Sequence, residues 1–516
     1  MKPSIAYNQL PAKRIAVEKE HWKEPHPSSW LSLLVGAGLL LFSYGANNVP
    51  VAAWFSPIFL LRFVRQQKFR LWLPLLYLTA IVAIAFQLRG MVPIPGLGYL
   101  IFLAISGLQF LIPYLADRLL ASRIGGLLAT LVFPSAWVVL EYINSFGPYG
   151  SWGVAAYSQY GDLALLQVLS VTGLWGVSFL IGWFAAVCNW LWEEGWNSTP
   201  ARRGVYLCIT TIAAIMLAGG ARMALFPPSS PTVRIASLSK RKIGVSPTDA
   251  TWNRLLSNQP TPEDLDSIRN WGAAVDNDLL ARAESEGQAG AKIVFWGEAN
   301  APIFKEDEAA FISRGAELAY KYQMYLGMAL GVWNTGKNPP LENKLVLLQP
   351  NGRVAWEYNK VRPVPGPEAA MQIRGDGKLR SLDTPYGRLS SVICFDADFP
   401  QLLRQAGALG TDILLDPSND WRAIDPWHTQ MASFRAIEEG VNLVRHTSQG
   451  LSAAFDYQGR RLSAMDDYYT AEYDLVSEIP TRGVRTIYSR LGDWLAWLCA
   501  AAFLMFVSRF FRHKRA

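Results

Sequence analysis

The sequence predicts a multi-pass α-helical membrane domain followed by a separate α/β domain. Residues from about 30 to 225 form a succession of apolar stretches, broken by short polar or Pro/Gly-rich pieces. Several of these stretches approach the ~20 residues that a helix needs to cross a bilayer. A stiff, proline-rich connection, Phe226 to Pro231, then leads into short strand-like stretches that alternate with longer amphipathic ones. That alternation is typical of an α/β core.

The apolar stretches predict seven helices before the α/β domain and one after it. The predicted helices lie at residues 30–46, 50–64, 71–88, 98–116, 124–143, 163–192, 205–225 and 492–511. The second helix is short, so a re-entrant segment is an alternative interpretation. The chain therefore divides into an N-terminal segment 1–29, a membrane domain 30–225, an α/β domain 231–485 and a C-terminal helix 492–511. The first segment is polar and contains proline, so no cleavable signal peptide is expected and the first helix should act as an uncleaved anchor.

Basic residues gather in alternate connections, which predicts the orientation in the membrane. Lys and Arg accumulate in short cytoplasmic loops, and with eight crossings the basic connections all fall on one side. These residues are Lys2, Lys13, Arg14, Lys19, Lys23, Arg62, Arg65, Lys68, Arg70, Arg118, Arg123, Arg202, Arg203, Arg509, Arg512, Lys514 and Arg515. We therefore expect cytoplasmic termini and an extracytoplasmic α/β domain. The same residues account for much of the net charge of +7, and no nucleic-acid-binding motif accompanies them, so no nucleic-acid partner is expected.

Within the α/β domain, the pattern predicts several strands and helices. Strands are expected at residues 233–238, 293–297, 324–333, 345–349, 413–415 and 441–444, and helices at 263–284, 306–321 and 401–409. A domain of about 250 residues is long enough to bury its own core. The pattern does not determine the order of the strands.

Of the four cysteines, Cys394 is the one that lies outside an apolar run. It ends the strand-like stretch that begins at Ser391, and a helix is predicted to open at Pro400. Unpaired N–H groups at a helix start favour negative charge, so this setting suits a thiolate nucleophile. An inert buried thiol is the alternative, because free cysteine is among the most buried residue types.

Two charged residues upstream complete a candidate catalytic set. Glu298 follows the strand-like stretch Ile293 to Gly297, and Lys360 follows a hairpin-like stretch that turns at Pro350 to Gly352. Each charge directly follows an apolar strand pattern, which predicts a position at the rim of a sheet. A carboxylate to accept the thiol proton, an ammonium to hold an oxyanion and a thiol to attack together make an acyl-transfer set.

This series resembles the Glu-Lys-Cys triad of the nitrilase, or carbon-nitrogen hydrolase, superfamily. The likeness covers roughly residues 231–485 and includes Asn419–Trp421, His428, Arg435–Gly440 and Arg445–Thr447 downstream. It implies a four-layer αββα sandwich, so the expected fold is a multi-pass helical membrane domain joined to a nitrilase-like domain.

Taken with the membrane helices, almost the whole chain resembles the bacterial apolipoprotein N-acyltransferase family. Gly147–Gly153 and Ala156–Gln159 are similar to the segment before that family's long sixth helix. The resemblance implies that Glu298 is the general base, Lys360 the oxyanion-stabilising cation and Cys394 the nucleophile. It also implies supporting roles, for the backbone N–H of Phe395 as a second oxyanion donor and for Glu368 and Asp396 beside the triad.

The implied reaction has two steps. Cys394 takes an acyl chain from a phospholipid as a thioester, and the α-amine of a lipoprotein's lipidated N-terminal cysteine then removes it as an amide. The resemblance further implies a bacterial inner-membrane location, a phospholipid donor, a lipoprotein acceptor, a monomer and no cofactor.

Three positions depart from the family's pattern. Asp396 stands where the family usually has glutamate, Pro367 precedes Glu368 in the loop after the lysine, and Gly297 stands where proline is commoner. Asp396 brings the motif closer to hydrolytic relatives, so a membrane-anchored amidase or other C–N hydrolase with the same triad is the alternative function. A third interpretation is a non-catalytic membrane protein that kept the fold. No metal site is expected, because no clustered His/Cys spacing accompanies His428, for which we expect a hydrogen-bonding role near the site.

Overall fold

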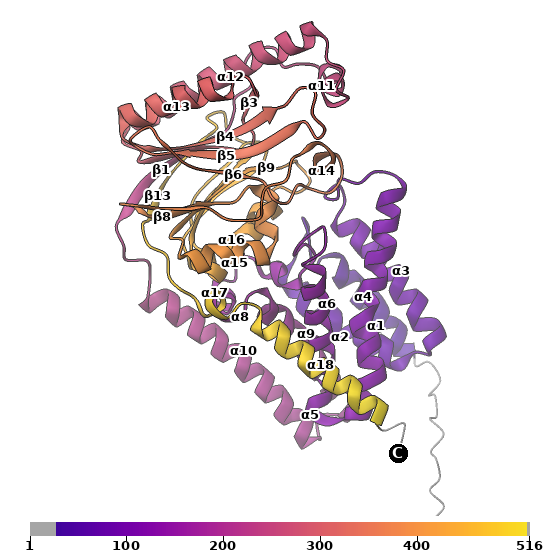
Figure 1. Cartoon of the computed structure of the whole chain (residues 1–516). Helices are drawn as coiled ribbons and strands as arrows, with labels where there is room; N and C mark the ends of the chain where they lie inside the picture. The colour runs from indigo at the N-terminus through magenta and orange to yellow at the C-terminus, as the bar shows by residue number, and fades with distance from the viewer. Residues whose placement is uncertain (1–26, 513–516) are drawn as a thin grey trace, which may run out of the picture.

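The computed structural model describes residues 27–512 and has two parts (Figure 1). Helices from the first 225 residues, together with the last helix, form a bundle, and the remaining residues form an α/β domain at one end of it. Most of the predicted segment 1–29, and the basic residues Lys514 and Arg515 of the tail, lie outside the described residues.

Each predicted membrane stretch corresponds to helical structure. The helices of this part are α1 (Pro27–Leu41), α2 (Pro50–Gln66), α3 (Phe69–Gln87), α4 (Leu97–Ile124), α5 (Gly126–Ala129), α6 (Val132–Asn144), α7 (Leu163–Leu166), α8 (Leu169–Thr172), α9 (Leu174–Glu194), α10 (Thr199–Leu225) and α18 (Trp494–Arg512), with a short 3-10 helix η1 (Ala155–Gln159). Within residues 27–512, six helical segments are long and apolar enough to cross a membrane, namely α3, α4, α5 with α6, α9, α10 and α18. α1 and α2 are shorter, with 15 and 17 residues.

The stretch 163–192, expected as one helix, is three helices. Gly173 has a φ of 63°, which interrupts the helical backbone between α8 and α9. A side chain at this position would also collide with the ring of Tyr488, which packs against it. The break therefore lets the short helix α8 contact α16 and α17 of the α/β domain while α9 runs on as a membrane helix.

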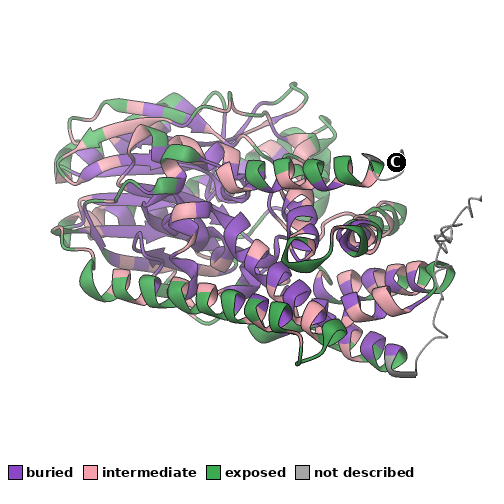
Figure 2. Cartoon of the chain, turned by 90° about the horizontal axis from the view of Figure 1, so that it is seen from below, coloured by how far each residue is buried: buried purple, intermediate pink, exposed green. Residues whose placement is uncertain are grey.

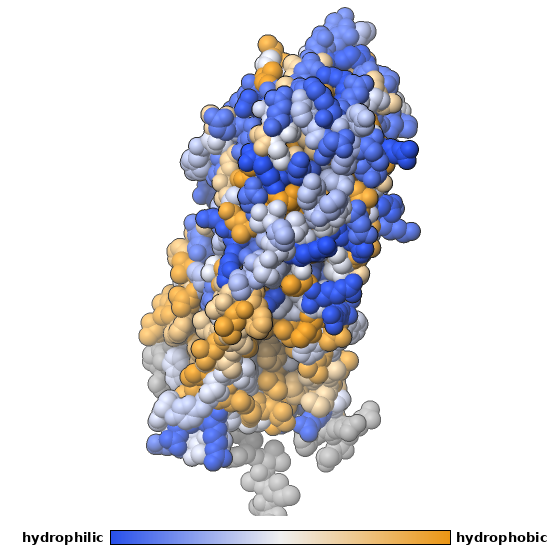
Figure 3. Space-filling model, turned by 90° about the vertical axis from the view of Figure 1, so that its left-hand side faces the viewer, coloured by the Kyte–Doolittle hydropathy of each residue, from blue (hydrophilic) through white to orange (hydrophobic). Residues whose placement is uncertain are grey.

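The surface of the helical part differs from that of the α/β domain. Apolar side chains dominate the lower, helical part of the face in Figure 3, and polar ones dominate the part above it. Figure 2 shows that many residues on the outer faces of the helices are exposed, whereas the strands are largely buried. The helix ends that carry the predicted cytoplasmic charges contact one another. Arg65 of α2 pairs with Asp117 of α4 at 2.8 Å. Arg123 of α4 lies 4.0 Å from the centroid of the Phe510 ring in α18.

The α/β domain contains two sheets. The first has the order β13-β1-β2-β4-β5-β6, with β3 beside β4, and the second has the order β12-β11-β10-β9-β8-β7. The strands are β1 (Thr232–Leu238), β2 (Ile293–Trp296), β3 (Ala301–Phe304), β4 (Tyr325–Trp333), β5 (Leu341–Leu348), β6 (Val354–Asn359), β7 (Ser381–Thr384), β8 (Gly387–Ser391), β9 (Ile413–Asn419), β10 (Asn442–Ser448), β11 (Leu451–Phe455), β12 (Arg461–Asp466) and β13 (Asp474–Pro480). β1, β2 and β4 are parallel, as are β8, β9 and β10.

Helices cover the outer face of each sheet, so the predicted αββα sandwich is confirmed (Figure 1). α12 (Pro262–Gln288) and α13 (Glu308–Tyr322) lie on the first sheet, and α15 (Pro400–Leu409) and α16 (Trp427–Glu439) on the second. α11 (Asp249–Leu256), α14 (Pro367–Met371) and α17 (Ile487–Leu491) complete the domain. The central strands are buried on both faces, which explains why they appear in the sequence as continuous apolar runs instead of alternating ones.

The hydrophobic core lies between and around the sheets. Phe295 of β2, Leu345 of β5, Leu389 of β8 and Leu415 of β9 are all fully buried in one cluster. This packing brings the ends of β2 and β6 in the first sheet close to the segments that follow β8 and β9 in the second. The residues predicted to carry the chemistry lie at these strand ends.

Candidate active site

Glu298 and Lys360 form a buried ion pair. Glu298 lies two residues beyond β2, and Lys360 is the first residue after β6. The Lys360 ammonium donates to Glu298 Oε1 at 2.7 Å and to Glu368 Oε1 at 2.6 Å. Burial disfavours the ammonium, but the charges of Glu298 and Glu368 prevail and raise the pKa of Lys360 well above its usual value. Lys360 is therefore a permanent cation between two carboxylates.

Asn343 is a fourth member of this cluster that sequence reasoning missed. Its side-chain amide in β5 donates to Glu298 Oε1 at 2.6 Å, and its carbonyl oxygen accepts from the Lys360 N–H at 2.9 Å. It therefore holds both partners of the ion pair. Little in the sequence signals this role, because Asn343 lies between the charged residues Glu342 and Lys344 at the polar start of the strand Leu341–Leu348.

Glu368 reaches Lys360 although Pro367 precedes it. Pro367 is the first residue of α14, where a missing N–H leaves no bond unmade. Glu368 follows in the first turn, and its second oxygen accepts from the N–H of Val364 at 3.2 Å. The proline thus starts the helix that presents Glu368.

Cys394 opens the 3-10 helix η2 (Cys394–Asp398), three residues beyond β8. Its φ of 53° is in the left-handed region, which is uncommon for a non-glycine residue. Its N–H donates to Asp416 Oδ1 at 2.8 Å, and Arg445 pairs with the other Asp416 oxygen at 2.6 Å. The Sγ atom lies 3.8 Å from the Asn419 carbonyl oxygen.

The environment of the sulfur differs from the one predicted. α15 begins at Pro400, six residues beyond Cys394, and the side chain is buried. Burial and then the charge of Glu298 raise the pKa of the Cys394 thiol well above its usual value, against the opposing charge of Lys360. The resting group is therefore a neutral thiol, and a base is required to remove its proton. The charges of Glu298 and Lys360 act directly on this thiol, so the three residues form one electrostatic cluster.

Phe395 and Asp396 follow Cys394 on the same turn. The carboxylate of Asp396 accepts from the Tyr358 hydroxyl at 2.8 Å and from the N–H of Arg362 at 2.7 Å. Burial raises the pKa of Asp396 to about 6, so the group is still largely a carboxylate at neutral pH. Asp396 therefore ties the loop after Lys360 to the turn that carries Cys394, and the shorter side chain reaches its partners without the extra methylene of glutamate.

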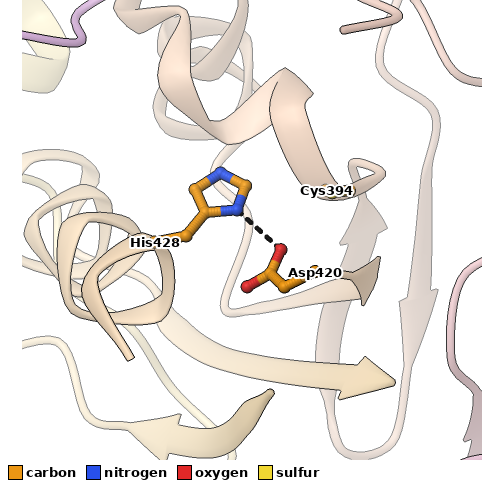
Figure 4. Close-up of side chains that lie close together, drawn as sticks. All are labelled: Cys394, Asp420 and His428. Carbon is orange, nitrogen blue, oxygen red and sulfur yellow. Dashed lines mark hydrogen bonds and ion pairs between the residues drawn. The ribbon is translucent and has the colours of Figure 1, made fainter. Parts of the chain in front are cut away.

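A second buried charge network lies on the other side of Cys394. His428 Nδ1 is 2.7 Å from Asp420 Oδ1, and Nε2 is 2.8 Å from Asp398 Oδ2. Figure 4 shows the first of these bonds beside Cys394. Burial favours the neutral ring, but the charges of Asp420 and Asp398 prevail and raise the pKa of His428 to about 9. His428 is thus an imidazolium that donates to both carboxylates.

Three side chains in or beside this network are close enough together to be tested as metal ligands. Ligand atoms of Cys394, Asp420 and His428 all lie within 4.8 Å of one another. A metal requires a free imidazole lone pair, yet both ring nitrogens face carboxylates, and Arg445 approaches Asp420 Oδ1 at 3.3 Å and His428 Nδ1 at 2.9 Å. The two cations share the Asp420 oxygen, so the set fits a hydrogen-bonded network better than a metal.

A loop of the helical domain joins this network. Trp152 donates from its indole N–H to Asp398 Oδ2 at 2.8 Å, and the N–H of Ser151 donates to the Asp398 carbonyl oxygen at 2.8 Å. Gly150 has a φ of 56°, and a side chain there would lie 2.5 Å from the same carbonyl oxygen. The sequence carried no signal for these contacts, because Trp152 and Asp398 are 246 positions apart.

A cavity of about 690 Å³ extends from Cys394 into the helical domain. Cys394 and Phe395 line it, whereas Glu298 and Lys360 do not. The other lining residues of the α/β domain are Val364, Trp421, Ile424 and His428, and the helical domain contributes residues of α1, α2, α3, α4 and α6, as well as the loop 147–155. Most of these side chains are apolar. A thiol that lines such a cavity can meet a reactive carbonyl whose hydrocarbon chain lies among the membrane helices.

Comparisons with known proteins agree with both halves of the chain. Residues 258–477 match the carbon-nitrogen hydrolase family model, and residues 36–187 match the model of the apolipoprotein N-acyltransferase N-terminal domain. Among solved structures, an amidase from Nesterenkonia sp. is 20% identical with a TM-score of 0.38, covering 52% of this chain and 97% of that one.

Curated relatives extend over most of the chain. An apolipoprotein N-acyltransferase from Geobacter metallireducens is 26% identical and covers 94% of this chain and 96% of its own length. A second, from Bradyrhizobium diazoefficiens, is also 26% identical, with 75% and 74% covered. With a membrane-helical half, a carbon-nitrogen hydrolase half and relatives that span both, the chain belongs to the apolipoprotein N-acyltransferase family and is an acyltransferase.

Proposed function

We propose that this protein transfers a fatty acyl chain from a phospholipid, through a thioester on Cys394, to the α-amine of the lipidated N-terminal cysteine of lipoproteins. Family membership supports lipoprotein N-acylation and an inner-membrane location in general terms. The thioester, the phospholipid donor and the residue roles are the parts that we add.

The cavity is the observation that carries the proposal. It joins a buried thiol to helices whose outer faces are apolar, and its lining is mostly hydrocarbon. Each methylene of an acyl chain that leaves water gains about 0.8 kcal/mol, so a long chain would bind here without polar contacts. A small soluble amide needs no such space, which favours acyl transfer over the amidase alternative.

In the first step, Glu298 accepts the Cys394 proton as the sulfur attacks the ester carbonyl of the donor. Lys360 and the N–H of Phe395 stabilise the resulting oxyanion. The ester C–O bond then breaks, the proton passes from Glu298 to the departing lysophospholipid oxygen, and the acyl group remains on sulfur. Two bonds to Glu298 Oε1, from Lys360 and Asn343, orient the carboxylate.

In the second step, the acceptor amine attacks the thioester carbonyl. Glu298 takes a proton from the amine, the C–S bond breaks, and the thiolate receives that proton as the amide leaves. Glu368 supports Lys360 in both steps. With Glu298 as its one carboxylate partner, the Lys360 ammonium would have a donor without an acceptor on its other side.

We also propose an orientation in which the α/β domain is extracytoplasmic and the termini are cytoplasmic. The alternation of basic connections supports it. On this view the cavity opens toward the outer leaflet, where a monomer would meet both lipid substrates.

Mass spectrometry of the purified protein mixed with phospholipid tests the proposal. We expect a fatty-acyl adduct on Cys394 that disappears when a diacylglyceryl peptide is added, with an equal amount of acylated peptide formed. Cys394→Ala should lose the adduct, and Cys499→Ala, which removes a buried thiol from α18, should keep it. Release of free fatty acid or hydrolysis of a small amide, with no peptide product, would select the hydrolase instead.

A further inference from the structure

A second pocket lies in the α/β domain, with a volume of about 280 Å³. Its walls come from the start of β8, the end of α15, the residues before β9, the end of α16 and the segment between β13 and α17. The residues that matter below are Thr411, Glu439, Arg482 and Arg485.

This pocket is distinct from the catalytic cavity. β8 and β9 are parallel, and Cys394 and Asn419 lie at or beyond their carboxyl ends. Arg388 and Asp412 line the pocket at the amino ends of the same two strands. At about 3.3 Å per residue, the length of β9 separates the two sites by roughly 20 Å.

Glu439 is a carboxyl group in the wall of the pocket. It is 2% exposed, and neither of its oxygens has a hydrogen-bond partner among the described residues. The neighbouring Glu438 is equally buried, yet it pairs with Arg435 at 2.8 Å and accepts from the N–H of Leu174 at 2.7 Å. Burial and the charge of Glu438 raise the pKa of Glu439 well above its usual value. Glu438 thus has direct partners, whereas in the described part of the chain the charges of Arg435 and Arg404 act on Glu439 without a hydrogen bond to it.

Backbone geometry keeps room for this carboxylate. A side chain at Gly407, on the facing turn of α15, would collide with Glu439 Oε2. Thr411 in the same wall is 5% exposed, and its hydroxyl likewise has no partner in the described part of the chain. A donor that entered the pocket would therefore meet a carboxylate and a hydroxyl together.

Guanidinium groups lie at the outer side of the pocket. Arg485 is exposed, has no ion pair within residues 27–512, and its Nη2 lies 3.3 Å from where a Gly410 side chain would begin. Arg482 pairs with Asp412 at 3.3 Å but remains 67% exposed. The pocket therefore offers an acceptor group within and cationic donors at its mouth, a pattern that fits a ligand with an ammonium and an anion a few bonds apart.

The position of the pocket in the chain puts it at the membrane surface. The N–H of Thr481 donates to the Pro231 carbonyl oxygen at 2.9 Å, in the linker that leaves the membrane helix α10. Arg485 is followed, after α17, by the membrane helix α18. Between them Ile487 and Leu491 are 50% and 63% exposed. The pocket wall thus lies between the ends of two membrane spans, where lipid headgroups are the most abundant polar groups.

We propose that this pocket binds the headgroup of a membrane phospholipid that carries a primary amine beside its phosphate, outside the catalytic cavity. The ammonium pairs with Glu439 and donates to Thr411, and the phosphate pairs with Arg485 and Arg482. Such a lipid would hold the α/β domain against the bilayer at the edge opposite the catalytic cavity.

Native mass spectrometry of the full chain in detergent tests this site. Phosphatidylethanolamine and phosphatidylglycerol, which share the phosphate but not the amine, are titrated into wild type and variants. We expect Glu439→Gln and Arg485→Ala each to retain one phosphatidylethanolamine fewer per chain than wild type. Glu472→Gln, which changes an exposed glutamate with an 82% exposed side chain, is the matched control and should retain as many as wild type.

Each other outcome overturns the proposal. Equal retention by Glu439→Gln and wild type would mean that the pocket holds solvent. If Glu439→Gln lost phosphatidylglycerol as well as phosphatidylethanolamine, the pocket would not recognise the amine. Displacement of the lipid by soluble phosphoethanolamine would identify a free metabolite as the ligand. Thr411→Val, which changes no charge, repeats the test if Glu439→Gln does not fold. Retention is measured without turnover, so the result is independent of the acyl-transfer proposal.

Discussion

Replacing Lys360 by methionine separates the oxyanion role that we propose for it from its structural role. Methionine has a similar volume but no charge, so the substitution leaves Glu298 and Glu368 facing each other without the ammonium that lies 2.7 and 2.6 Å from them. Lys360 is 1% exposed, so water cannot take the place of that ammonium. Two effects on different observables should follow.

The first effect is on stability. Removing one partner of a buried ion pair costs roughly 3–5 kcal/mol. The side chain of Glu368 is 28% exposed and can be partly solvated or take a proton, so we expect the lower end, about 3 kcal/mol. Typical domains have about 5–15 kcal/mol of stability, so the variant should still fold. The second effect is the loss of an oxyanion donor, which typically lowers kcat by about 10²–10³.

The double variant Lys360→Met with Glu368→Gln distinguishes the two effects. It removes one of the facing carboxylates, so most of the lost stability should return in thermal unfolding of the detergent-solubilised protein. Formation of the acyl adduct on Cys394 should remain as slow as in the single variant. If the double variant regained both stability and rate, Lys360 would only neutralise charge, and the oxyanion role would be wrong.

Three further predictions concern the surroundings of the sulfur. Because burial and Glu298 raise the thiol pKa, the rate of alkylation of Cys394 by iodoacetamide should keep increasing above the pKa of about 8.5 of free cysteine, and a midpoint below 7 would contradict the neutral resting thiol. The pKa of His428 is about 9 in the folded protein against about 6.5 unfolded, so its contribution, up to about 3 kcal/mol, is fully present below pH 6.5 and lost as the pH rises through 9. The stability difference between wild type and His428→Asn should therefore shrink over that range, and a constant difference would refute the charged state. Trp152→Phe keeps the ring but removes the bond to Asp398, so acyl-adduct formation should slow by about tenfold, the effect of ~1.4 kcal/mol, whereas an unchanged rate would show that the bond does not position the site.

The positions of Glu298 and Lys360 could be predicted from sequence because each follows closely on a strand. Apolar strand patterns are local, and a charged residue that directly follows one belongs at the rim of a sheet. Glu298 and Lys360 have this position after β2 and β6. The roles themselves came from a family resemblance, since the pattern does not say which strand ends meet.

The sequence could not predict what determines the charge state of the sulfur. A helix start at Pro400 suggested a stabilised thiolate, but the start lies six residues away, and the depth of burial depends on how two sheets and a helical domain pack. The break at Gly173 was missed for a similar reason. An apolar run from 163 to 192 predicts one helix, and the contact with Tyr488 that requires a glycine comes from 315 positions further along the chain.

The contacts of loop 147–153 indicate why catalysis of this kind requires the membrane domain as more than an anchor. Ser151 and Trp152 hold both the backbone and the side chain of Asp398, which lies on the same turn as Cys394. Asp398 in turn binds His428, and the same loop lines the cavity. A chain that fills the cavity therefore touches the residues that orient the turn carrying Cys394. The binding energy of the hydrocarbon chain, far from the carbonyl, can in this way help to align the reacting atoms. A detached α/β domain lacks the loop and cannot use binding energy in this way.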